Sequence, residues 1–159
     1  MKKIVFLFLI ISVLFSCKSK KVTVNSSPEK RYDTITEAKY SEVKSIKTKR
    51  AYELGKRLLE TCNTSRFKSF NSSEATESVI KNATVEKVSQ TCQKINNRNG
   101  KFLDLNLIEI IHDKATDDYI YRYDIKYQKK FYQRQLRIVI NSEDKVAGIS
   151  TKELPKKPL

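Results

Sequence analysis

The sequence contains few of the residues from which most catalytic and metal sites are built. Histidine occurs once, as His112 beside Asp113, and glycine occurs only at positions 55, 100 and 148. Three scattered glycines cannot form a phosphate-binding loop, and one histidine with three cysteines does not show the spacing of a zinc site. His112 could act as a general base, but a single histidine at a strand end is usually an ordinary surface residue. The sequence therefore predicts no catalytic residue, no metal and no cofactor.

A long hydrophobic run is also missing. The longest apolar stretch, residues 4–15, is far shorter than the roughly 20 apolar residues of a membrane-spanning helix. Two lysines precede it, and the small residue Ser16 follows it, directly before Cys17. A basic head, a short apolar run and a small residue at the end are the three parts of a secretory signal peptide. We therefore expect residues 1–16 to be a cleaved signal peptide.

The four residues at the expected cleavage point, LFSC at positions 14–17, resemble the lipobox of bacterial lipoproteins. The resemblance implies that Cys17 becomes the mature N-terminus and carries the two or three acyl chains that stable anchoring requires. An ordinary signal peptide followed by a chance cysteine is the alternative. Lys18 is not the aspartate that retains lipoproteins of enteric bacteria at the inner membrane, so the resemblance implies an outer-membrane location in a bacterial envelope.

The rest of the chain is long enough for one domain with a single core. Residues 17–37 are rich in lysine and poor in apolar residues, which favours a lipidated tether. Residues 38–151 are expected to form the domain. Residues 152–159 contain two prolines among lysines and are expected to be a disordered tail.

The chain is strongly basic, with a formal net charge of +14. In a cell envelope, such a charge favours anionic lipid headgroups, acidic glycans or a small anionic ligand as partners, and no nucleic acid is expected there. A solvated basic surface without a specific partner is the alternative. The oligomeric state does not follow from the sequence.

Cys62 and Cys92 remain as a pair if Cys17 is acylated. Disulfides form in the oxidising compartment that an exported protein reaches. A bridge would close a loop of about 30 residues and would stabilise the fold by about 3 kcal/mol. Two reduced, buried cysteines are the alternative.

Helical patterns fill the first half of the domain, and alternating patterns fill the second half. Apolar residues recur with a helical period over 38–62, a short helix is expected over 73–81, and a third helix is expected from the N-cap Thr84 to Gly100. Cys62 and Cys92 each fall on the apolar face of their expected helix, so packing of the two helices could bring them into contact. Three stretches then resemble strands, at 119–127, 132–140 and 146–151, after a less regular run near Leu107 that a β-bulge would explain.

This order predicts an α+β fold in which three N-terminal helices pack on a curved antiparallel sheet of three to four strands. Together with the tyrosine-rich strand at 119–127, it resembles the nuclear-transport-factor-2-like, or cystatin-like, cone superfamily, in particular its lipoproteins without an assigned function. The resemblance implies a sheet wrapped around a long helix, with a pocket at the open end.

Tyr119, Tyr121 and Tyr123 alternate along one face of the expected strand. Such tyrosines are most often core residues whose hydroxyls reach the rim. The alternative is a ligand pocket that they line, with Arg122 and Arg137 attracting an anionic group. We therefore expect a non-enzymatic binding or interaction module. A small-molecule enzyme of the cone superfamily and a purely structural envelope lipoprotein are the alternatives.

Overall fold

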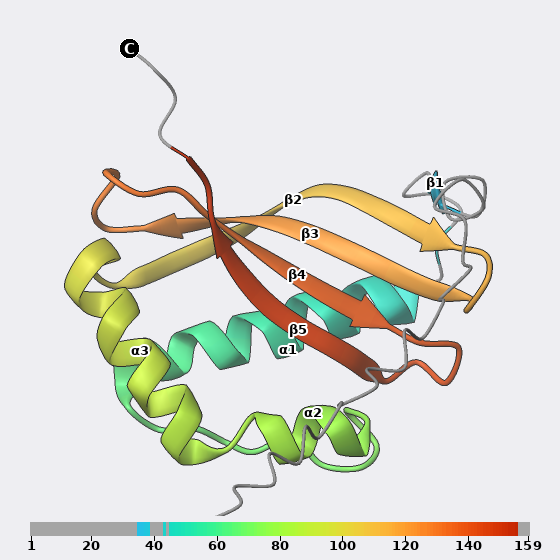
Figure 1. Cartoon of the computed structure of the whole chain (residues 1–159), viewed down its shortest axis with the longest axis horizontal. Helices are drawn as coiled ribbons and strands as arrows, with labels where there is room; N and C mark the ends of the chain where they lie inside the picture. Colours follow the sequence, from blue (N-terminus) through green and yellow to red (C-terminus); the bar gives the residue numbers. More distant parts are fainter. Residues whose placement is uncertain (1–34, 39–42, 44, 156–159) are drawn as a thin grey trace, which may run out of the picture.

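The structure, a computed structural model, describes residues 35–38, 43 and 45–155. The expected signal peptide, Cys17 and most of the expected tether lie outside the described residues. The elements follow the order β1 (Ile35–Glu37), α1 (Ser45–Thr64), α2 (Glu77–Asn82), α3 (Val85–Asn99), β2 (Phe102–Asp113), β3 (Asp118–Tyr127), β4 (Arg134–Ile140) and β5 (Val146–Glu153) (Figure 1). None of the helices among these residues has the length and apolar character needed to cross a bilayer.

The fold is α+β, as the sequence predicts. Within the described residues the sheet is antiparallel and has five strands in the order β1-β2-β3-β4-β5, so each strand pairs with its neighbour in the chain. The sequence predicts three to four strands, and this prediction was wrong because it missed the short strand β1. In β1, Ile35 pairs with Asp113 at the end of β2. β1 also lies inside the range 17–37 that was expected to be tether. Three residues are too few for an alternating pattern to stand out.

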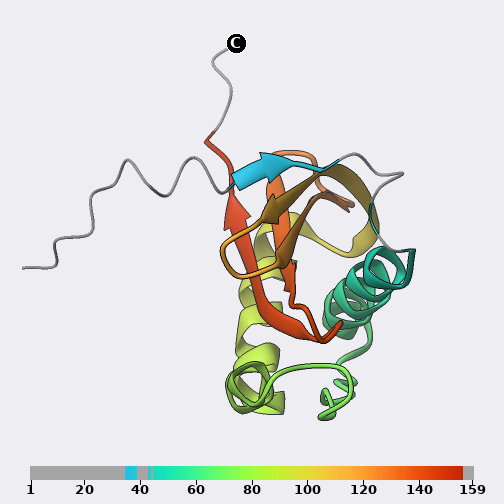
Figure 2. The same ribbon diagram turned by 90° about the vertical axis from the view of Figure 1, so that its right-hand side faces the viewer.

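The three helices of the described chain all lie on one face of the sheet (Figures 1 and 2). The sheet curves around α1, and α2 and α3 continue the helical layer toward β5. The register of β2 against β3 shifts between Leu107 and Glu109, at the place where the sequence predicts a bulge. A bulge adds local twist and bends the strand, which contributes to this curvature.

Side-chain capping marks the start of α3, whereas the other two helices begin later than the sequence predicts. α1 begins at Ser45, later than the expected 38, and α2 begins at Glu77, later than the expected 73. The main-chain N–H of Asn71 donates to the Glu74 carboxylate at 3.1 Å, but this contact closes a turn before the helix and does not begin it. In α3, the Thr84 side chain accepts from the N–H of Lys87, and Gly100 ends the helix with a φ of 71°, as expected of a cap.

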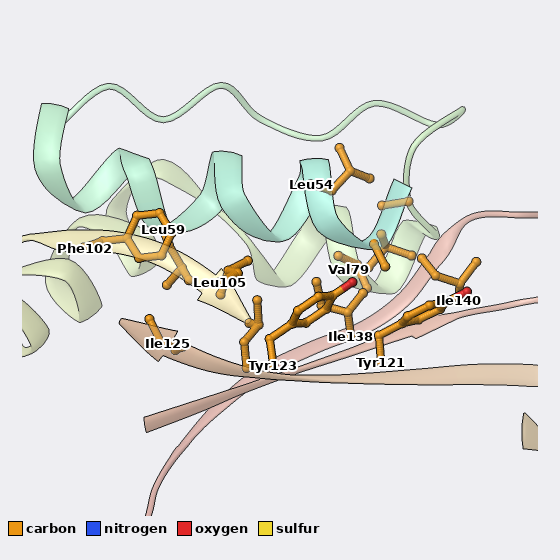
Figure 3. Packing of buried hydrophobic residues seen from close by; sticks show 14 of the residues in the cluster. Leu54, Leu59, Val79, Phe102, Leu105, Tyr121, Tyr123, Ile125, Ile138 and Ile140 are labelled. Atoms are coloured by element: carbon orange, nitrogen blue, oxygen red, sulfur yellow. The ribbon is translucent and has the colours of Figure 1, made fainter. Parts of the chain in front are cut away.

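The core lies between the sheet and α1 (Figure 3). Tyr121, Leu136 and Ile138 are fully buried there. α1 approaches β4 closely at Gly55, where an added Cβ would come within 2.6 Å of a methyl group of Ile138. The glycine therefore sets the distance between the helix and the sheet.

Candidate functional site

The five residues predicted to form a ligand pocket do not come together. Tyr121 and Tyr123 are 0% and 2% exposed and face α1, so they are core residues. Arg122 binds the side chains of Glu109 and Gln135 on the opposite face of β3. Arg137 of β4 lies opposite Arg122 in the register of the two strands. Neighbouring residues of a strand point to opposite faces, so the sheet separates the tyrosines from the arginines.

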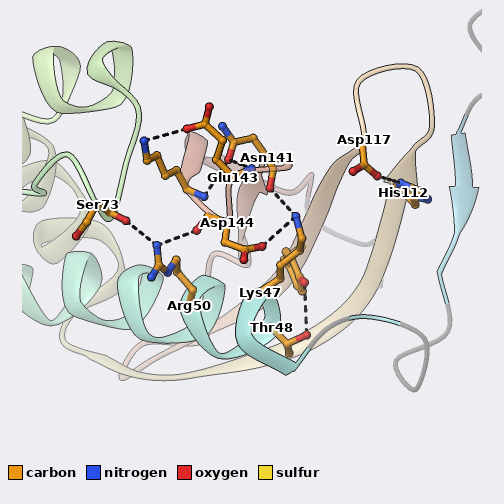
Figure 4. Close-up of polar contacts among 11 residues, drawn as sticks. Lys47, Thr48, Arg50, Ser73, His112, Asp117, Asn141, Glu143 and Asp144 are labelled. Atoms are coloured by element: carbon orange, nitrogen blue, oxygen red, sulfur yellow. Dashed lines mark hydrogen bonds and ion pairs between the residues drawn. The ribbon is translucent and has the colours of Figure 1, made fainter.

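Tyr119 and His112 form a partly buried contact where β2 ends and β3 begins. Their rings stack with centroids 4.3 Å apart, and the Nε2 atom of His112 lies 2.8 Å from a carboxylate oxygen of Asp117 (Figure 4). The partners of the histidine ring are thus a carboxylate and an aromatic ring. No group of three or more histidine, cysteine and acidic residues that could hold a metal occurs within the described parts of the chain.

A disulfide joins Cys62, near the end of α1, to Cys92 in α3, with their Cα atoms 4.7 Å apart. Both cysteines lie on the apolar faces of their helices, where the sequence places them. Nearby, the Asn96 side chain donates to the main-chain carbonyl of Cys62. The disulfide and this hydrogen bond hold the end of α1 against α3.

A cavity of about 350 Å³ opens beside this disulfide, between α1, α2, α3 and β5. Both cysteines belong to its wall. Most of its lining is apolar and comes from all four elements: Leu58, Leu59, Val79, Ala83, Val88, Ile95, Ala147 and Ile149. Its size lies in the range of small-ligand pockets, which cover about 300–1,000 Å³. We identify it as the candidate binding site and call it the α3–β5 cavity.

Polar groups lie at the rim of the α3–β5 cavity. Lys87 and Asn82 belong to its wall, and the lysine ammonium donates to the asparagine carbonyl at 3.5 Å. At the last residue of β5, Arg98 and Arg134 share the single carboxylate of Glu153, at 2.9 Å and 3.1 Å. Of these four charged side chains, three are cations and one is an anion.

Tyr123 also borders a second hollow, of about 860 Å³, between the first half of α1 and β2. Its wall includes Tyr52, Leu105 and Leu107, and Lys49 is the charged residue there. Neither Arg122 nor Arg137 belongs to this wall. The hollow thus does not restore the predicted combination of tyrosines and arginines.

The α3–β5 cavity carried little signal in the sequence. Its lining residues are spread from position 58 to position 151, and each of them also fits an ordinary core or helix-face position. The placement of Cys62 and Cys92 on helix faces was the one usable hint, because it brings α1 and α3 together.

The chain was compared with protein-family models, with curated protein sequences and with solved structures, and none of the three comparisons found a match.

Proposed function

We propose that the protein is a lipid-anchored protein of the bacterial envelope that acts as a non-enzymatic binding module, and that it binds its partner group in the α3–β5 cavity. The anchor is acylated Cys17, and the outer membrane is the proposed location. The finer form of the proposed fold is the cone of the nuclear-transport-factor-2-like superfamily. The curvature of the sheet around α1 supports it (Figure 2).

The observation that carries the proposal is the apolar lining of a cavity that remains open to solvent. Exposed apolar surface is costly in water, at about 25 cal/mol for each Å². A hollow lined by side chains such as Leu58, Val88 and Ile149 is therefore a favourable place for an apolar group of a partner. Lys87 at the rim adds a preference for an anionic or hydrogen-bond-accepting group beside it.

An enzyme of the cone superfamily is the second candidate function. General acid–base catalysis needs a titratable group within reach of the substrate. Lys87 is the ionisable side chain among the described residues that line the cavity, because Cys62 and Cys92 are bonded to each other. His112 does not line it. A binding role fits this wall better than a catalytic one.

Filling the cavity tests the proposal. The fluorescent apolar anion 1-anilinonaphthalene-8-sulfonate should bind the folded domain, and Val88→Phe should weaken binding because the larger ring occupies the cavity. Val85→Phe is the matched control, since Val85 lies on the same helix but is 58% exposed and outside the cavity wall. Equal binding by both variants would place the apolar site elsewhere and would remove the support for this function.

The anchor is tested separately. Cys17→Ala should abolish incorporation of labelled fatty acid and should move the protein from the membrane fraction to the soluble fraction, because no acyl chain can then be attached. A variant that still carries the label would show that the anchor is elsewhere. Neither result depends on the cavity.

A further inference from the structure

We propose that the free edge of β5 is the docking site for an extended segment of a partner protein, which pairs with this edge as an added strand and places alternate apolar side chains in the α3–β5 cavity. The inference rests on the proposed function and names the class of partner. Backbone pairing would supply affinity, and the cavity would supply selectivity, as in other cases of strand addition.

The direction of the main-chain groups supports the docking site. The N–H of Leu154 donates to the carbonyl of Gln133 at 2.8 Å, which makes these two residues a hydrogen-bonded pair of the ladder between β4 and β5. Bonded and non-bonded pairs alternate along antiparallel strands. The N–H and C=O groups of Ile149 and Thr151 therefore point away from β4. No main-chain partner meets them within the described chain.

A segment of the chain itself already uses this edge at its first residue. The N–H of Val146 donates to the carbonyl of Glu74, and the N–H of Thr76 donates to the carbonyl of Val146, both at 2.9 Å. The resulting bridge is parallel and joins Ala75 to Val146. The chain then turns away into α2 at Glu77. The edge can thus accept an extended segment, and it becomes free where this segment leaves.

The α3–β5 cavity follows the free edge. Five consecutive residues of β5, from Ala147 to Thr151, belong to its wall. This run of five residues places the cavity along β5, which is an edge strand of the sheet. Every second side chain of a segment paired there would face the helices, where the wall is apolar.

The middle of the β5 edge carries none of the charges and prolines that usually prevent pairing with other chains, while a β-bulge lies near its start and Lys152 and Glu153 lie at its end. Exposed edge strands are commonly protected by proline, by charged residues or by a covering helix or loop. Residues 147–151 have the sequence AGIST, without a charge or a proline. The open cavity lies where α3 would otherwise cover the strand. Such an edge fits a strand that is supplied by a partner.

The charges around the edge indicate the chemistry of the partner. Lys87 lies near one end of the cavity, and Arg98 and Arg134 share one carboxylate beyond the other end. Of these four charged side chains, three are cations and Glu153 is the anion. A docking segment should therefore combine alternating apolar residues with acidic residues on its flanks.

The experiment begins with a phage-displayed library of random dodecapeptides, selected on the purified mature protein. Peptides with alternating apolar residues and acidic flanks should be enriched. Their affinity is then measured by calorimetry for the wild type, Thr151→Pro and Thr151→Val. Both substitutions remove the hydroxyl that accepts from Arg134, but only proline removes the outward N–H. Proline is tolerated on an edge strand where its nitrogen faces outward, so thermal melting should show both variants folded.

We expect Thr151→Pro to weaken peptide binding at least about tenfold relative to Thr151→Val, because a main-chain hydrogen bond is lost and the ring blocks the approaching strand. Amide hydrogen exchange gives a second readout that needs no variant. In the free protein the N–H groups of Ile149 and Thr151 should exchange faster than those of Ser150 and Lys152, which bond to β4. Bound peptide should slow the exchange of the first pair.

Other outcomes overturn the inference in distinguishable ways. Equal affinity for the proline and valine variants, or no enriched peptide, would exclude strand addition. If Val88→Phe still weakens binding of the fluorescent anion in that case, the cavity binds a small molecule, and the proposed function remains. If raising the protein concentration slows exchange at Ile149 and produces a sedimenting dimer, the occupant of the edge is a second copy of this chain.

Discussion

The two ends of α1 are packed in different ways. At the start of the helix, Lys47 and Arg50 reach the turn between β4 and β5, where they contact the carbonyls of Asn141 and Asp144 (Figure 4). Arg50 also donates to the carbonyl of Ser73. Near its end, the same helix is tied to α3 by the disulfide, and it borders the α3–β5 cavity.

One amphipathic helix is thus held by polar contacts near its start and borders an open site near its end. Lys47 is only 4% exposed, and its ammonium lies 3.2 Å from a carboxylate oxygen of Asp144. These polar contacts fill the space between the start of the helix and the turn after β4. At the other end a covalent bond fixes α3, so the space between the elements need not be filled for the helices to stay in place.

The largest effect is expected from removing the disulfide. The double variant Cys62→Ala with Cys92→Ala should lose about 3 kcal/mol of unfolding free energy, because the unfolded chain is no longer constrained by a closed loop. Urea unfolding of the oxidised wild type and the variant measures the loss. The reduced wild type is the control and should resemble the variant. A loss below about 1 kcal/mol would show that packing alone fixes α3.

A larger side chain should lower the free energy of unfolding more where α1 packs closely on β4 than where it can enter the cavity. Gly55→Leu should cost about 2–3 kcal/mol, because even a Cβ would lie 2.6 Å and 2.8 Å from the buried side chains of Ile138 and Leu136. Val88→Phe places its extra volume in the cavity and should cost less than about 1 kcal/mol. Both values come from urea unfolding. Similar costs for the two variants would contradict the contrast.

Breaking the polar contacts at the start of α1 should have a smaller effect. Lys47→Met keeps the length of the side chain but leaves the carbonyl of Asn141 without its charged donor, at a cost of about 2 kcal/mol. Lys49→Met is the control, since Lys49 is exposed and makes an ion pair only with Glu53 on the same helix. If the two variants melt at the same temperature, the contacts of Lys47 do not stabilise the turn.

The smallest effect depends on pH. Two hydrogen bonds from the Arg57 guanidinium, at 2.7 Å and 2.8 Å, are the main reason that the pKa of Glu74 is lowered to about 2; partial burial opposes them. The ordinary value is 4.5. A lowered pKa stabilises the fold fully above the unfolded value, and this contribution is lost as the pH falls from 4.5 toward 2.

The variant Glu74→Gln should therefore be less stable than the wild type by about 1 kcal/mol at pH 7. The deficit should shrink between pH 4.5 and pH 2, where the wild-type carboxylate becomes protonated. Chemical unfolding at several pH values measures it. A deficit that stays constant down to pH 2 would mean that the glutamine itself disturbs the turn, and that charge plays no part.

Local patterns in the sequence determined the secondary structure. The helical period placed α1 and α3, and alternation placed β3, β4 and most of β5, because burial on one side imposes these periods. Thr84 and Gly100 marked the ends of α3 through their own backbone preferences. The irregular run near Leu107 marked a bulge. The sequence also placed Cys62 and Cys92 on helix faces that could meet, and alternation alone was enough to separate Tyr121 from Arg122.

Only the tertiary structure decided where space was left. β1 exists because the end of β2 offers it an edge, and its three residues carry no pattern of their own. Lys47 is buried because the turn after β4 folds over it. No sequence pattern near position 47 predicts this burial. The α3–β5 cavity and the free edge beside it arise from how α2 and α3 meet β5. Such features depend on contacts between residues far apart in the chain, and local periodicity has no information about them.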